Sequence, residues 1–226
     1  MELEQSFIAL IEQSIKTNWY LNALTDYKGI TLQYRDVARK IEKIHILLEN
    51  AGIEKGDKIA ICGRNSAHWT VTYLAVITYG AVVVPILHEF KPDNIHHIVN
   101  HSEAKAVLAA SSNWENMNER MMPDVKLFMM LDNFSIIHSK SKEVRVVRVR
   151  INEYFGKKYP RSFTSNDVRY HVEKPEELAV LNYTSGTTSF SKGVMIPYRS
   201  LWSNTQFAYD NLPFIHPGDN IVCMLP

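Results

Sequence analysis

Apolar residues recur along the chain at two spacings, and each spacing predicts a different kind of element. Near the start, apolar side chains return at every fourth position, which lines one face of a helix. These side chains are Phe7, Ile11, Ile15 and Trp19. A second helix is expected from Thr31, as its N-cap, to Gly52, and a third over 67–79 with Gly80 directly after it.

Short apolar runs alternate with these helices and are bounded by turn residues, which is typical of buried strands. The runs cover residues 58–62, 81–84, 105–109 and 126–131. Pro85 is expected to close the second run, Pro92 to open a helix, and residues 114–120 to form another short helix. Alternating strands and helices predict an α/β fold, a mostly parallel sheet with helices on both faces.

The later sequence is less regular. Val144, Val146 and Val149 alternate with arginines, which predicts a half-exposed strand, and residues 157–173 are polar and loop-like. After them we expect, in order, a strand at 178–183, a polar loop at 184–192, a strand at 193–196, a helix at 198–212 and a strand at 221–225.

These elements suggest three regions. We expect an N-terminal helical segment at 1–30 and an α/β subdomain at 31–175. Residues 176–226, with two strands, the polar loop between them and a helix, are expected to continue the same large domain.

Composition excludes some classes of protein. Of the 226 residues 46% are hydrophobic and 22% charged, with a formal net charge of +1, so no nucleic-acid partner is expected. The longest apolar run, residues 80–87, is too short to cross a membrane. The N-terminus lacks the basic start of a secretory signal, and Cys62 and Cys223 are expected to be buried free thiols. Together these features predict a cytoplasmic protein.

The segment LNYTSGTTSFSKGVMIP, residues 181–197, carries the most chemistry. It combines hydroxyl side chains, Gly186 and Lys192, which suits the binding of a polyphosphate. It is not a Walker loop, because Ser191 stands where that motif has glycine and Gly193 stands where it has serine or threonine. A strand is also expected after the lysine, where a Walker loop would open a helix.

The segment resembles the phosphate loop of the adenylate-forming superfamily, roughly Y-T-S-G-T-T-G-x-P-K-G-V. Residues 183–188 and 192–194 match that pattern, whereas Ser189 and Ser191 replace its glycine and proline. Residues 31–34, 56–61 and 79–86 are similar to other family segments, so the likeness runs from about Thr31 to Pro226. The segment GAVVVPI, residues 80–86, looks most like the corresponding segment of the long-chain fatty-acid:CoA ligase branch.

The resemblance implies a two-step reaction: a carboxylate, here a long-chain fatty acid, is activated by ATP to an acyl-adenylate and then transferred to coenzyme A. It assigns phosphate binding to side chains around the loop, with Mg²⁺ bridging phosphate oxygens. These residues are Thr184, Ser185, Gly186, Thr187, Thr188 and Lys192. No catalytic residue is expected in this chain, because the family's catalytic lysine and C-terminal domain are expected beyond Pro226. The chain alone is therefore expected to be inactive in the complete reaction.

Several alternatives stay open. The acceptor could be an acyl-carrier protein, the protein another adenylation-domain enzyme, or the chain a non-catalytic nucleotide-binding scaffold. Homo-oligomerisation and peripheral membrane contact are also left open. His97 and His101 share a helix face but lack a third ligand, so no metal site is expected.

Two other features allow both a functional and a structural interpretation. A basic stripe around the valines could contact acidic partners, although a solvated face explains it better. The stripe comprises Lys142, Arg145, Arg148 and Arg150. Residues 88–90 follow a buried strand and either line a ligand crevice or form a plain surface loop.

Overall fold

The computed structural model describes residues 6–184, 192–216 and 218–223. Its centre is a seven-stranded sheet. The strands are β3 (Lys58–Cys62), β4 (Val82–Ile86), β5 (Ala106–Ala109), β6 (Leu127–Met130), β7 (Ile136–Ser139), β8 (Leu178–Thr184) and β9 (Lys192–Pro197). They lie in the order β7-β6-β5-β3-β4-β8-β9. The five inner strands are parallel, and β7 and β9 run antiparallel to their neighbours at the two edges. The predicted α/β fold with a mostly parallel sheet is confirmed.

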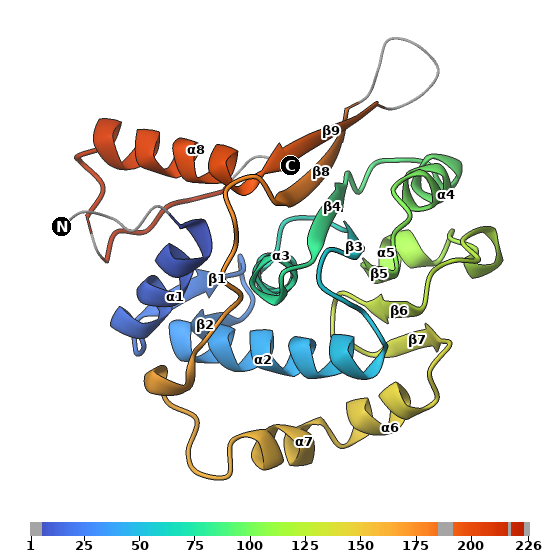
Figure 1. Ribbon diagram of the computed structural model, residues 1–226, viewed down its shortest axis with the longest axis horizontal. Coiled ribbons are helices and arrows are strands. Elements are labelled where there is room, and N and C mark those ends of the chain that lie inside the picture. Colours follow the sequence, from blue (N-terminus) through green and yellow to red (C-terminus); the bar gives the residue numbers. More distant parts are fainter. Residues whose placement is uncertain (1–5, 185–191, 217, 224–226) are drawn as a thin grey trace.

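Helices cover both faces of this sheet (Figure 1). They are α1 (Phe7–Thr17), α2 (Tyr34–Asn50), α3 (Ala67–Tyr79), α4 (Pro92–His101), α5 (Ser111–Trp114), α6 (Glu143–Val149), α7 (Ile151–Lys158) and α8 (Tyr198–Asn211), with short 3₁₀ turns η1 (Glu119–Met121) and η2 (Ser165–Asp167). Ile59 and Ile61 join the apolar cluster that contains α2 and α3, whereas Ala60 and Cys62 join the cluster that contains α4. Alternate residues of β3 thus pack into two separate cores, because successive side chains of a strand point to opposite faces of the sheet.

Local signals correctly predicted two helices. Ser66 caps α3, its side chain accepting a hydrogen bond from the backbone N–H of Trp69, and Gly80 ends the helix with a φ of 87°. Pro92 occupies the first turn of α4, where the proline ring removes no helical hydrogen bond.

The start of the second helix was predicted wrongly. Thr31 is not its N-cap but begins β2 (Thr31–Gln33), which pairs with β1 (Asn22–Thr25) in a two-stranded antiparallel sheet. The helix begins after Gln33, whose backbone N–H donates to the Asp36 carboxylate at 3.0 Å. The Asp36 carboxylate, three residues into the helix, therefore caps its N-terminus, whereas Thr31 does not.

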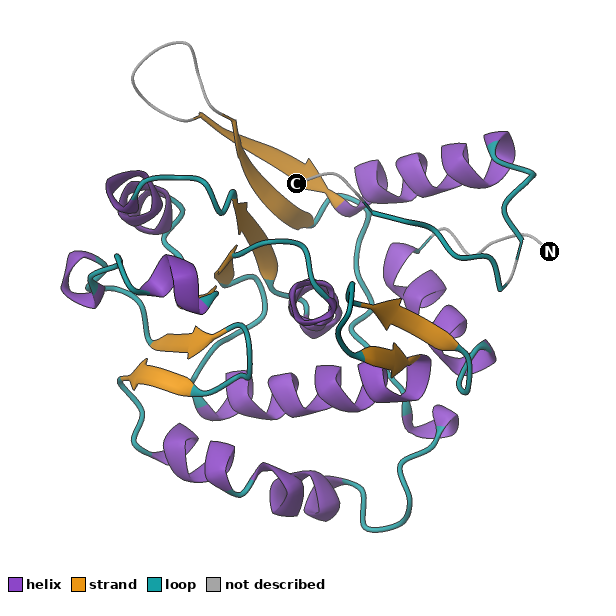
Figure 2. Ribbon diagram, turned by 180° about the vertical axis from the view of Figure 1, so that it is seen from behind, coloured by secondary structure: helices purple, strands orange, loops and turns teal. Residues whose placement is uncertain are grey.

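The strand predicted at Val144–Val149 is also wrong, because this segment is helix α6. Val144 and Val147 are both buried, a spacing of three that only a helix places on one face. Helices α6 and α7 run beside α2 in both views (Figures 1 and 2). Of the basic stripe, Arg148 donates to the backbone oxygens of Phe134 and Asn133, which ties α6 to the loop after β6.

Smaller differences concern element ends. Strand β4 continues through Pro85, which pairs in register with Ile61, and the helix expected at 114–120 is divided between α5 and η1. Part of the expected loop at 157–173 belongs to α7 and η2. The described part of the last predicted strand, residues 221–223, forms no strand. Both cysteines are free, but Cys223 is exposed, contrary to the prediction. The division at residues 30 and 175 stays a prediction.

Candidate functional site

The candidate site lies at the end of the antiparallel hairpin formed by β8 and β9, called here the β8–β9 hairpin. Thr184 and Lys192 are Cα partners in its ladder, and both are exposed. The structure therefore brings together a hydroxyl and an ammonium group that are eight positions apart in sequence. Of the other predicted site residues, Ser185, Gly186, Thr187 and Thr188 lie outside the described residues, as do Ser189 and Ser191.

The sheet gives this hairpin end its position. Strand β8 is parallel to β4, with Val83 opposite Val180, so the chain leaves both strands at the same edge. Ligands of open α/β sheets bind in the crevice beyond the carboxyl ends of parallel strands. Figure 1 shows the far ends of β8 and β9 standing clear of the helices, so Thr184 and Lys192 are accessible there.

Tyr183 anchors the hairpin just before Thr184. Its side chain is only 4% exposed and belongs to the same apolar cluster as Ile98 and Val99 of α4. Its Oη lies 2.6 Å from Nδ1 of His101, the last residue of α4. Burial raises the pKa of the Tyr183 phenol, so the hydroxyl stays protonated and can donate to that nitrogen.

Gly193 is needed because the Tyr183 ring lies against it. The two residues are cross-strand partners, and a Cβ added at Gly193 would lie 3.3 Å from Cζ of Tyr183 and 3.2 Å from Cδ1 of Leu181. Few real Cβ contacts are that short, so a side chain here would push the ring or the strand aside. The glycine after Lys192 therefore has a packing role in this chain.

The contact between His101 and Tyr183 was missed by sequence reasoning, which considered His101 only as a partner of His97. The two histidine rings do lie near each other, with centroids 5.7 Å apart. Within the described ranges, however, no group of three His, Cys, Asp or Glu side chains could hold a metal ion. No local pattern could have revealed the contact, because 82 positions separate its two residues.

The loop after β4, which sequence reasoning left open between crevice and surface, is partly packed. The backbone oxygen of His88 accepts a hydrogen bond of 2.8 Å from the Asn113 side chain, and Phe90 packs against the apolar cluster that contains α4. Glu89 is exposed, its carboxylate 3.9 Å from Nε2 of His88. These contacts fix the loop at the edge of the sheet from which the hairpin also projects.

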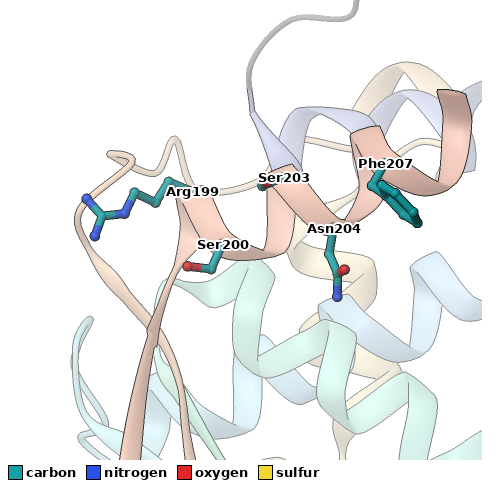
Figure 3. A pocket seen from close by; sticks show the side chains of 5 residues that line it. All are labelled: Arg199, Ser200, Ser203, Asn204 and Phe207. Carbon is teal, nitrogen blue, oxygen red and sulfur yellow. The ribbon is translucent and has the colours of Figure 1, made fainter.

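A surface hollow along α8 is not part of this site. It is lined by Arg199, Ser200, Ser203, Asn204 and Phe207, all on one helix (Figure 3). Helix α8 follows the end of β9 at Pro197, whereas Lys192 begins that strand. The strand separates the hollow from the hairpin end by about 17 Å at the usual rise per residue.

The described donors at the hairpin end fit a polyphosphate. A threonine hydroxyl and a lysine ammonium group donate hydrogen bonds to anionic oxygens and do not compete for a cation. Mg²⁺ commonly binds through substrate phosphates and one or two carboxylates, so it does not require a preformed protein cage. This chemistry is consistent with a nucleotide that brings its metal ion with it.

Comparison with known proteins is consistent with nucleotide binding. The model of the AMP-binding enzyme family matches residues 12–226. The fatty acyl-CoA synthetase A of Dictyostelium discoideum is 27% identical over 202 residues, covering 89% of this chain and 29% of the relative. A long-chain-fatty-acid–CoA ligase of Escherichia coli O6:H1 is 27% identical over 235 positions, covering 96% of this chain and 41% of the relative. The chain thus spans less than half the length of these relatives.

Solved structures show the same fold. A long-chain-fatty-acid-CoA ligase (FadD1) from Archaeoglobus fulgidus superposes with a TM-score of 0.69 at 20% identity, over 92% of this chain and 40% of the other. The anthranilate CoA ligase AuaEII, solved with anthranoyl-AMP, gives a TM-score of 0.72 at 16% identity, over 93% and 37%. No helix of the described ranges is long and apolar enough to span a membrane. The family model matches nearly the whole length of the chain, so this chain belongs to the AMP-binding enzyme family.

Proposed function

We propose that the protein containing this chain activates a carboxylic acid with ATP, forming an acyl-adenylate and pyrophosphate, and then transfers the acyl group to coenzyme A. The observation that carries the proposal is the pairing of Thr184 with Lys192 at the exposed end of the hairpin. This pairing puts a hydroxyl donor and a positive charge together at the sheet edge where α/β folds bind ligands.

The role proposed for the hairpin is to hold the β- and γ-phosphates. Lys192 would neutralise part of their charge, and Thr184 would donate a hydrogen bond to a phosphate oxygen. We assign the same role to Ser185, Gly186, Thr187 and Thr188, which lie outside the described residues. Catalysis by such a site consists of positioning the phosphates for in-line displacement and stabilising the charge of the departing pyrophosphate.

A long-chain fatty acid is the proposed substrate. Two of the relatives described above are named as fatty acyl-CoA synthetase and long-chain-fatty-acid–CoA ligase. Their similarity, 27% identity, supports this substrate class together with coenzyme A as the acceptor, while Mg²⁺ is proposed as the metal that accompanies ATP. We further propose a cytoplasmic location, supported by the two free cysteines.

Acid-dependent ATP–pyrophosphate exchange tests the proposal. The complete reading frame is purified, and exchange of labelled pyrophosphate into ATP is measured with Mg²⁺ and acids of several chain lengths. We expect exchange only when an acid is added, and fastest exchange with long-chain acids. Exchange that is absent with every acid, in a protein shown to be folded, would contradict the proposal. Exchange restricted to an amino acid or an aromatic acid would contradict the substrate class alone.

A further inference from the structure

Helix α4 connects the sheet edge to Tyr183, next to the end of the β8–β9 hairpin. It starts at Pro92, soon after β4 ends, and finishes at His101. The imidazole of His101 meets the Tyr183 ring edge to face, with centroids 5.7 Å apart and planes at 86°. Nδ1 and Oη are 2.6 Å apart, a distance at which an O–H···N hydrogen bond is short and well formed.

The environment of the phenol keeps it able to donate this hydrogen bond. Tyr183 is buried, and burial raises the pKa of its hydroxyl, so the group remains a donor near neutral pH. In the tautomer that carries the ring hydrogen on Nε2, Nδ1 of His101 accepts the phenol proton. Any replacement that keeps an acceptor at the Nδ1 position should preserve the contact.

The contact is placed where it can affect the hairpin end. Tyr183 precedes Thr184 on β8, and its partner Gly193 follows Lys192 on β9. The ring lies against Gly193, so a shift of the ring would displace both strands. Most of β9 is exposed, and few side chains of that strand can compensate.

We propose that His101 is a positioning residue, which holds Tyr183 and thereby fixes the Thr184–Lys192 pair at the end of the β8–β9 hairpin. The chemical class that this pair would take is a nucleotide polyphosphate, and in this respect the inference rests on the proposed function. His101 contacts Tyr183 and would act on the ligand through that ring.

Steady-state kinetics of pyrophosphate exchange test the role. His101→Leu and Tyr183→Phe should each raise the KM for MgATP about fivefold, the effect of one neutral hydrogen bond. The KM for the acid, kcat and the unfolding midpoint should change little. The double variant should be no worse than either single one, because both remove the same bond. His101→Asn should restore the wild-type KM, because its Oδ1 occupies nearly the position of Nδ1 and accepts the same proton.

Asn94→Ala, at an exposed position earlier on α4, is the matched control and should leave the KM for MgATP unchanged. A second readout does not depend on activity: amide hydrogen exchange in 192–197 should be about fivefold faster in His101→Leu and normal in His101→Asn. If the wild-type protein shows no pyrophosphate exchange, the proposed function fails, and the amide exchange still decides the positioning role. Unchanged amide exchange in His101→Leu, or strictly additive effects of His101→Leu and Tyr183→Phe, would overturn the inference.

Discussion

The middle of the sheet and the β8–β9 hairpin are held in different ways. In β3, the residues Ile59 to Cys62 are all fully buried between two layers of helices. In β9, the first four residues are exposed, and Met195 is 73% exposed. Apolar burial therefore stabilises the middle of the sheet, whereas the β9 side of the hairpin depends on its ladder with β8 and on a few specific contacts. Substitutions should unfold the first region and alter ligand binding in the second.

The largest expected effect is a cavity in the buried region. Phe128 of β6 is 2% exposed and packs against Trp114, with ring centroids 5.5 Å apart. Phe128→Ala should lower the free energy of unfolding by about 4 kcal/mol, since both burial and packing are lost. Urea unfolding monitored by circular dichroism measures this change. Met195→Ala, the matched truncation in the hairpin, should stay within about 0.5 kcal/mol of wild type. Similar losses of unfolding free energy in both variants would contradict the proposed difference between the two regions.

The second expected effect is a pH dependence that arises in the buried region. Burial lowers the pKa of His45 to about 4, despite the opposing effect of the nearby Glu42 carboxylate. The neutral ring donates from Nε2 to the backbone oxygen of Ala75 at 2.9 Å. Because the unfolded state binds the proton more tightly, His45 contributes full stability above its ordinary pKa of 6.5 and loses it as the pH falls toward 4.

The loss over that interval should be about 3 kcal/mol, at 1.36 kcal/mol per pKa unit. Urea unfolding at a series of pH values measures it. The groups that face His45 are Glu42, Thr78, Tyr79, Tyr170 and, through Glu42, Lys158. His45→Gln keeps a donor toward Ala75 and should remove most of the slope between pH 6.5 and 4. A slope that survives this substitution would assign the titration to another group.

A smaller effect is expected where the hairpin joins the body. Tyr198 begins α8 directly after β9, is 3% exposed, and donates from its hydroxyl to the backbone oxygen of Ile77 at 3.1 Å. Tyr198→Phe should lower the free energy of unfolding by about 1 kcal/mol, because that buried oxygen loses a donor. Thermal unfolding checks this value. Tyr209→Phe on the exposed side of the same helix is the control and should have no measurable effect.

The contrast between the two regions also explains what the sequence could predict. The central strands were found because their side chains are buried on both faces, which produces unbroken apolar runs. Residues 144–149 were assigned to a strand because valines alternate with arginines there, yet packing of Val144 and Val147 against α2 and its neighbours stabilised a helix. Tertiary contact outweighed the local pattern there.

The candidate site was predicted in part for a similar reason. The hydroxyl residues and Lys192 were recognised as a local motif, but Thr184 and Lys192 were both expected in a loop, and their pairing across two strands was not predicted. The support of Tyr183 by His101 depends on the packing of α4 beside β8, and no spacing along the chain reports it. The described structure thus adds the contacts behind the motif, while the motif itself was readable in the sequence.

The most direct test of the central claim compares Lys192→Ala with wild type in acid-dependent ATP–pyrophosphate exchange. Lys192 is exposed at the hairpin end, so its removal should leave the free energy of unfolding within about 0.5 kcal/mol. The KM for MgATP should rise about tenfold or more, since a charged hydrogen bond to phosphate is lost. Lys174→Ala, another lysine on the surface, serves as the control and should behave like wild type. An unchanged exchange rate and an unchanged KM in a folded Lys192→Ala protein would contradict the assignment of this hairpin to phosphate binding.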